Sequence, residues 1–180
     1  MIVCAMNFTG KTKLTNEEFM DFYEELWEKT SHRGTYPQKS EIEKNKAEGE
    51  KRYNSLEKEL ENEMWQELPN SKSYKISTAG RVKYNDKIIL QYDTEKTGYL
   101  RLDKNENGVD HTVTVYTLVA KAFLGKTEGD GYDVHHIINN GYDNRPCNLI
   151  LLTREQHNAV HSEKKYTLDE LRNILKVPIL

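Results

Sequence analysis

Four of the chain's six histidines fall within one short stretch between Val134 and His161. Two of them are adjacent, and the other two lie four positions apart near the end of the stretch. Imidazole is the commonest protein ligand for a metal ion, and its pKa near neutrality suits it to accept a proton from water. The spacing therefore suggests one metal site and one general base, built from His135, His136, His157 and His161.

The two later histidines are predicted to lie on one face of a helix. Thr153 followed by Gln156 forms a capping box, in which the hydroxyl binds the third helical N–H and the amide reaches back. A helix that begins there carries His157 and His161 at i and i+4, with Cβ atoms about 6 Å apart. That separation suits two imidazoles that share one ion.

The two earlier histidines are predicted to lie on a hairpin. The apolar run Leu149–Leu152 reads as a short buried strand, and Val134–Ile137 reads as its partner across a polar loop. Adjacent residues of a strand point to opposite faces, so a kink or bulge would be needed to aim both His135 and His136 inward. The predicted unit is strand, loop, strand, helix.

This stretch resembles the HNH endonucleases, whose ββα-metal fold wraps one cation. The resemblance rests on the His-His pair, on Asn148 twelve positions after His136, and on His157 and His161 nine and thirteen positions after that Asn. It implies that His135, His157 and His161 are metal ligands and that His136 is the general base. It also implies that Asn148 pins the loop and holds the base in orientation.

The resemblance implies a metal-dependent endonuclease that hydrolyses phosphodiester bonds of double-stranded DNA, most like phage or mobile-intron homing enzymes. Such hydrolysis must deprotonate a water and neutralise charge on the leaving 3′ oxygen, which one divalent metal ion can do. Three imidazoles suit Zn or Ni, whereas phosphoryl chemistry often uses Mg or Mn. We expect Mg or Mn to support cleavage, with Zn or Ni as alternative occupants of the site.

Two alternatives belong to other functional classes. The first is a non-catalytic DNA-binding protein that keeps the ββα unit as a metal-stabilised scaffold. The intact His136 argues against it, because a scaffold needs metal ligands but no base. The second is a structural zinc module for protein partners, which gives no role to Asn148. The Cys-x-x-Cys pairs of many HNH relatives are missing, so no structural zinc is expected.

The length, composition and charge of the chain limit its domain number, its core size and the place of a DNA contact. A chain of 180 residues makes one or two small domains, and its hydrophobic content of 36% with a mean hydropathy of −0.85 predicts a modest core. The net charge of −3 does not by itself indicate a nucleic-acid-binding protein. However, residues 1–70 hold 10 basic and 15 acidic residues, whereas residues 71–180 hold 16 and 14. A DNA contact is therefore expected on the second part, as a local basic patch.

The cysteines and the N-terminus favour a cytoplasmic protein, in the host cell if the gene is phage-encoded. Cys4 and Cys147 are far apart, which argues against a disulfide scaffold and fits a reducing compartment. The apolar start over residues 1–6 is too short for a membrane span and lacks the basic residues of a signal peptide.

The region before the histidine cluster contains a predicted sheet. Short strands alternate with turn residues over 73–77, 81–84, 87–91, 98–103 and 110–115, which predicts one small antiparallel meander. Residues 65–84, with Trp65 and a Ser-x-x-Gly-Arg-Val turn, resemble the modular DNA-binding motif that often precedes HNH cores in phage homing endonucleases. Candidate DNA contacts are Arg81, Lys83, Arg101, Arg145 and Arg154, although plain surface solvation explains Arg145 and Arg154 equally well.

The predicted fold class is α+β. Residues 1–64 form a helical region without an assigned role, with helices over 15–29 and 41–64 that each begin with a capping box. Residues 65–115 form the β-meander. Residues 116–165 form the HNH core with a lead-in helix at 116–124, and residues 166–180 form a C-terminal packing helix.

Overall fold

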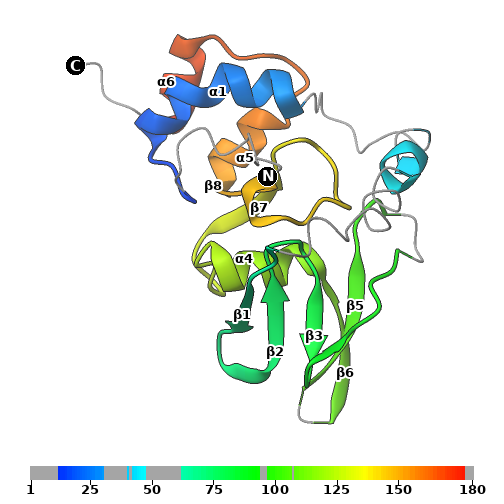
Figure 1. Ribbon diagram of the computed structural model, residues 1–180. Helices are drawn as coiled ribbons and strands as arrows, with labels where there is room; N and C mark the ends of the chain where they lie inside the picture. The colour runs from blue at the N-terminus through cyan, green and yellow to red at the C-terminus, as the bar shows by residue number, and fades with distance from the viewer. Residues whose placement is uncertain are drawn as a thin grey trace.

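The computed structural model describes residues 12–30, 40, 42–47, 62–93, 97–106 and 108–176. Helices and antiparallel strands are mixed along this part of the chain, so the predicted α+β class is confirmed (Figure 1). The strands form a four-stranded sheet in the order β1-β2-β3-β4 and two two-stranded sheets, β5-β6 and β7-β8.

The predicted strand–loop–strand–helix unit is present. Strand β7 (Tyr132–His136) pairs antiparallel with β8 (Leu149–Thr153), and helix α5 (Arg154–Val160) follows directly. A single 3-10 turn, η1 (Pro146–Asn148), leads into β8. The Thr153 hydroxyl and the side chain of Gln156 form the predicted capping box at the start of α5. Helix α5 therefore begins at a fixed point beside the hairpin.

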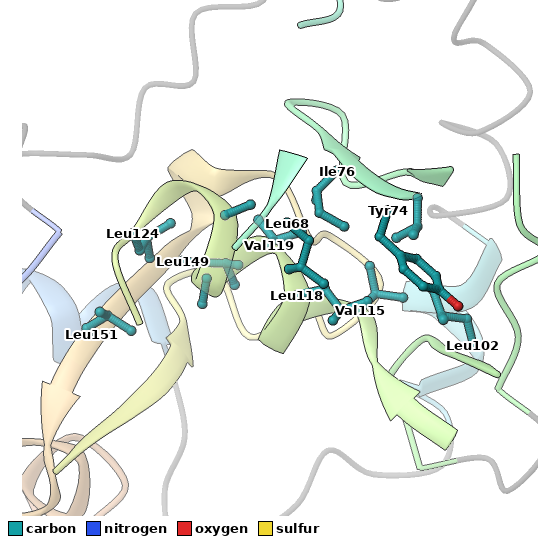
Figure 2. Close-up of a cluster of buried hydrophobic side chains, with 13 residues drawn as sticks. Leu68, Tyr74, Ile76, Leu102, Val115, Leu118, Val119, Leu124, Leu149 and Leu151 are labelled. Atoms are coloured by element: carbon teal, nitrogen blue, oxygen red, sulfur yellow. The ribbon is translucent and has the colours of Figure 1, made fainter. Parts of the chain in front are cut away.

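Strand β8 is buried on both faces, because it lies between two hydrophobic clusters. Leu149 and Leu151 belong to one cluster, whereas Ile150 and Leu152 belong to the other. Figure 2 shows Leu149 and Leu151 next to apolar side chains of the first cluster. The alternation of a strand thus explains why β8 is apolar at every position from 149 to 152.

The first cluster joins the hairpin to the four-stranded sheet through helix α4 (Val115–Phe123). Figure 1 shows α4 between the ββα unit and the sheet formed by β1 (Trp65–Leu68), β2 (Ser71–Ser77) and β3 (Val82–Tyr84). The helix buries Leu118 and Val119 in this cluster. The predicted lead-in helix therefore holds the sheet and the hairpin in a fixed relation.

The second cluster gives the described part of the N-terminal region a structural role. Helix α1 (Asn16–Thr30) and helix α6 (Leu168–Leu175) pack on each other and on α5. Their apolar side chains meet Ile150 and Leu152 of β8. The predicted capping boxes of both helices are present, between Thr15 and Glu18 and between Thr167 and Glu170.

Gln156 ties α5 to the start of α1. Its side chain is fully buried, and Nε2 donates to the Leu14 carbonyl at 3.2 Å and to Asn16 Oδ1 at 3.0 Å.

We expect Gln156→Ala to lower the free energy of unfolding by about 2–3 kcal/mol, because it leaves buried acceptors unpaired and removes half of the capping box. Urea denaturation measures the change. The exposed Asn158→Ala on the same helix should stay within about 0.5 kcal/mol of wild type, and an equal loss in both variants would contradict the assignment.

The single five-stranded meander expected from the sequence is wrong. Strand β1 was not predicted, β4 covers only Lys87–Ile88, and the last two strands, β5 (Arg101–Glu106) and β6 (Val109–Thr114), form a separate ribbon. The reason lies in the connection between the two sheets. Asp93 accepts hydrogen bonds from the Thr97 and Gly98 N–H groups and from the Tyr142 hydroxyl, so the chain turns toward the hairpin loop.

The end of the second predicted helix is also wrong. Residues 40 and 42–47 are helical, and residues 48–61 lie outside the described part. Residues 62–64 are not helical. Instead, the Met64 N–H donates to the Thr78 hydroxyl, and the Met64 carbonyl accepts from the Thr78 N–H.

Cys147 is disulfide-bonded, although the wide sequence separation of the two cysteines argued against a disulfide scaffold. Among the described helices, none has the length and apolar character needed to cross a bilayer.

Candidate active site

Three of the four clustered histidines come together between β7 and α5. His135 lies on β7, His157 lies on α5, and His161 is the C-cap residue of α5. One ring nitrogen of each lies within 4.8 Å of the others, and Nε2 of His161 is 3.2 Å from Nδ1 of His135. His135 pairs across the hairpin with Ile150, whose side chain lies in the cluster on the α5 side. Strand pairing therefore aims His135 at the helix.

The donor set fits one divalent cation. Burial, followed by the neighbouring His157, lowers the pKa of His161 to about 4. Burial also lowers the pKa of His157, although the charge of Asp133 acts in the opposite direction. These two rings are therefore neutral at pH 7, with lone pairs to offer. A tetrahedral zinc ion spaces its nitrogen ligands by about 3.3 Å, close to the separation of the His135 and His161 nitrogens.

A carboxylate borders the three histidines. Asp133 Oδ2 lies 4.0 Å from Nδ1 of His157 and 3.1 Å from Nη1 of Arg154. Carboxylates at this position commonly orient metal-binding imidazoles. The exposed Arg154, a candidate phosphate contact, therefore makes an ion pair at the edge of the site.

His136 points to the other face of the hairpin. The register of β7 and β8 runs without interruption, so the bulge that would aim both adjacent histidines to one side is not present there. The His136 ring lies beside Tyr116 and Tyr99, with centroid distances of 5.2 and 5.7 Å, and the residue is 7% exposed. Burial lowers its pKa to about 4, against the opposing effects of Asn144 and Asp143.

Asn148 closes the loop between the two strands. Its Oδ1 accepts from the Ile138 N–H at 3.0 Å, and its Nδ2 donates to the Asp143 carbonyl at 2.8 Å. The hydrogen bond to His136 comes from a different residue, because Oδ1 of Asn144 lies 3.1 Å from Nε2 of His136. Sequence reasoning missed Asn144, since nothing in the sequence separates it from the other asparagines of the loop.

Removing the Asn148 side chain should destabilise the fold. Asn148 is 2% exposed and uses both ends of its carboxamide, so Asn148→Ala leaves a partly buried N–H and a buried carbonyl unpaired. We expect a loss of about 2–4 kcal/mol, measured by urea denaturation. Asn173→Ala, on the exposed face of α6, is the control and should change stability by less than about 0.5 kcal/mol. A small effect of both variants would exclude a pinning role for Asn148.

The candidate DNA contacts are already engaged in several interactions. Arg81 pairs with Glu63 and lies over the Trp65 ring, and the ammonium of Lys83 is 3.9 Å from the centroid of that ring. Arg145 forms a bidentate pair with the buried carboxylate of Asp143, with distances of 2.9 and 2.8 Å. Arg101 is half-buried on β5.

Comparison with known proteins agrees with this geometry. Residues 115–159 match the model of a family described as HNH endonuclease. A solved structure entitled "DNA binding and cleavage by the HNH homing endonuclease I-HmuI" is similar to the chain at 24% sequence identity. The similarity covers 63% of this chain and 67% of that one, with a TM-score of 0.48. A search among curated proteins finds no match. The matched segment contains α4, both strands of the hairpin and nearly all of α5, so the similarity to the HNH endonuclease family covers the ββα unit and its lead-in helix.

Proposed function

We propose that this protein is a metal-dependent endonuclease of the HNH type that hydrolyses phosphodiester bonds of double-stranded DNA. The observation that carries the proposal is the convergence of three imidazole nitrogens within 4.8 Å of one another. Two of them belong to the segment that matches the HNH endonuclease model, and His161 follows two residues after its end. His135, His157 and His161 would hold a single divalent cation, with Mg or Mn for activity and Zn or Ni as other occupants.

Each group has a defined part in the proposed reaction. A cation held by His135, His157 and His161 would supply charge stabilisation at the leaving oxygen of the phosphodiester. His136, kept neutral by its burial, accepts the proton of the attacking water. Asn148 keeps the loop between β7 and β8 closed, so that the two strands present these histidines in a constant relation.

The rest of the chain would position the duplex. We assign this role to residues 65–115, with Lys83 and Arg101 as phosphate contacts, and to Arg154 beside the metal site. Arg81 and Arg145 would contribute mainly through their ion pairs with Glu63 and Asp143, which hold the turn and the loop that carry them. Residues 116–165 would form the nuclease core, and α6 packs against α5 within it.

A plasmid assay tests the proposal. Supercoiled DNA incubated with the purified full chain should become nicked or linear with Mg or Mn and should stay intact with a chelator. His157→Ala should reduce both metal affinity, measured by competition with a chromophoric chelator, and cleavage by more than about 100-fold, because an ion held by two ligands dissociates readily. His111→Ala, an exposed histidine on β6, is the matched control. Undiminished cleavage with chelator present would refute metal dependence.

One observation favours the rival function, a non-catalytic DNA-binding protein with a metal-stabilised scaffold. His136 is buried between two tyrosines, and a scaffold has no need to expose it to water. The rival predicts tight metal binding and DNA binding without cleavage by any divalent ion. The same plasmid assay, combined with a gel-shift measurement, therefore separates the two functions.

A further inference from the structure

We propose that Asn144 is a positioning residue for His136, and that Gly80 of the neighbouring sheet holds Asn144 in place. The inference rests on the proposed role of His136 as the base. It assigns the orienting role to a residue other than Asn148, which contacts the backbone at Ile138 and Asp143.

The contact between Asn144 and His136 selects one tautomer. Oδ1 of Asn144 lies 3.1 Å from Nε2 of His136, and both residues are buried. A carboxamide oxygen only accepts hydrogen bonds, so Nε2 carries the proton of the neutral ring. The lone pair is then on Nδ1, which is the nitrogen left to receive a proton from water. The tautomer, and not only the ring orientation, depends on Asn144.

The other end of the Asn144 side chain adds no hydrogen bond to the described part of the fold. Its Nδ2 is buried and has no hydrogen-bond partner within the described ranges, whereas Asn148 uses both ends of its carboxamide. A buried amide donor without a partner is costly. Because the fold gains so little from Nδ2, the contact of Oδ1 with His136 is the interaction that accounts for an asparagine here.

Gly80 supports Asn144 from the turn between β2 and β3. Its φ is +78°, and a Cβ at this position would lie 3.0 Å from both the carbonyl carbon and oxygen of Asn144. The turn itself is fixed, because the Ser77 hydroxyl accepts from the Arg81 N–H at 2.9 Å and the Gly80 carbonyl accepts from Gln91 at 3.0 Å. The turn at Gly80, in the sheet proposed to contact DNA, therefore lies directly against Asn144, the residue proposed to orient His136.

Nitrogen NMR of the histidine rings tests the tautomer without depending on cleavage. In wild type, Nε2 of His136 should carry the proton. In Asn144→Ala this preference should be lost, and single-turnover cleavage should fall by about 10-fold to 100-fold while DNA and metal affinities stay near wild type. Asn144→Asp, which keeps an acceptor oxygen, should retain the tautomer.

The matched control for Asn144 is Asn140→Ala. Asn140 is another buried asparagine of the loop. Its Oδ1 accepts a hydrogen bond from the Tyr142 N–H at 3.0 Å rather than from His136. It should leave the tautomer unchanged. A wild-type ring protonated at Nδ1, or a tautomer that is the same in wild type and Asn144→Ala, would overturn the inference. An inactive wild type with the expected tautomers would instead refute the nuclease function and leave the positioning role standing.

A glycine pair tests the support from the sheet. Gly80→Ala should displace Asn144, weaken the Nε2–H preference of His136 and lower cleavage by about 10-fold or more. Gly129→Ala shares the positive φ, at +72°, but meets no atom within 4 Å, so it controls for backbone strain alone. It should leave the tautomer and cleavage near wild type. Equal His136 spectra for the two variants would show that Gly80 does not hold Asn144.

Discussion

Replacing His136 with Ala should reduce the rate of DNA cleavage by about 10²-fold to 10⁴-fold, the range typical for loss of a general base. DNA affinity and metal affinity should change little. The physical reason is the geometry of β7, because His136 and the proposed cation ligand His135 occupy opposite faces of one uninterrupted strand. Single-turnover cleavage with saturating Mg measures the first effect, and gel shift and chelator competition measure the others.

The burial of His136 dictates the controls for this experiment. The ring fills space between Tyr99 and Tyr116, so His136→Ala leaves a cavity and lowers stability. Cleavage should therefore be compared well below the unfolding temperature of the variant, with His136→Gln as a variant of similar volume. His111→Ala should cut like wild type. Wild-type rates for both His136 variants would remove His136 from the mechanism, and a loss of metal affinity would place it among the ligands instead.

The same burial has two opposite consequences for catalysis. It keeps the imidazole neutral at pH 7, since the pKa is lowered to about 4. A base with so low a pKa also holds a transferred proton weakly. A DNA phosphate next to the ring would raise the pKa again, because a nearby negative charge favours the protonated imidazole. The base would thus gain strength only with a substrate phosphate bound beside it.

The histidine cluster could be predicted from the sequence because its geometry is local. His157 and His161 lie at i and i+4 of a capped helical segment that follows directly on β8, so only one more histidine had to be placed. Strand alternation also defines the two faces of His135 and His136. What the sequence could not supply was the role of each asparagine, because the contact from Asn144 to His136 depends on how the loop folds back.

The sheet boundaries depended on contacts distant in sequence. The hydroxyl of Tyr142 donates to Asp93 at 2.7 Å, and this bond across 49 positions accompanies the turn that separates β4 from β5. A pattern of alternating polar and apolar residues carries no information on such a bond. The glycine at 80 was interpreted as a turn residue, which is correct, but its close approach to Asn144 is a tertiary feature.

The metal-free protein should lose stability as the pH falls from about 6.5 toward 4. His136 and His161 have folded-state pKa values lowered to about 4, whereas unfolded histidine titrates near 6.5. Between these values the unfolded chain binds more protons than the folded chain, so acid favours unfolding. The stabilising contribution is fully present above pH 6.5. His136 alone should give a slope of about 1.4 kcal/mol per pH unit within the window, and His161 acts in the same direction.

Urea denaturation with chelator at pH 7, 6 and 5 measures this slope. His161→Gln should flatten it, because a glutamine does not titrate, whereas the exposed His111→Gln should leave it unchanged. Adding Zn should raise stability at pH 7 and lose that effect at pH 5, since protons compete with the ion for the same nitrogens. A slope that is unaffected by His161→Gln would mean that His161 is solvated like an unfolded histidine. Zinc stabilisation that persists undiminished at pH 5 would mean that the ion is held by carboxylates rather than by the three histidines.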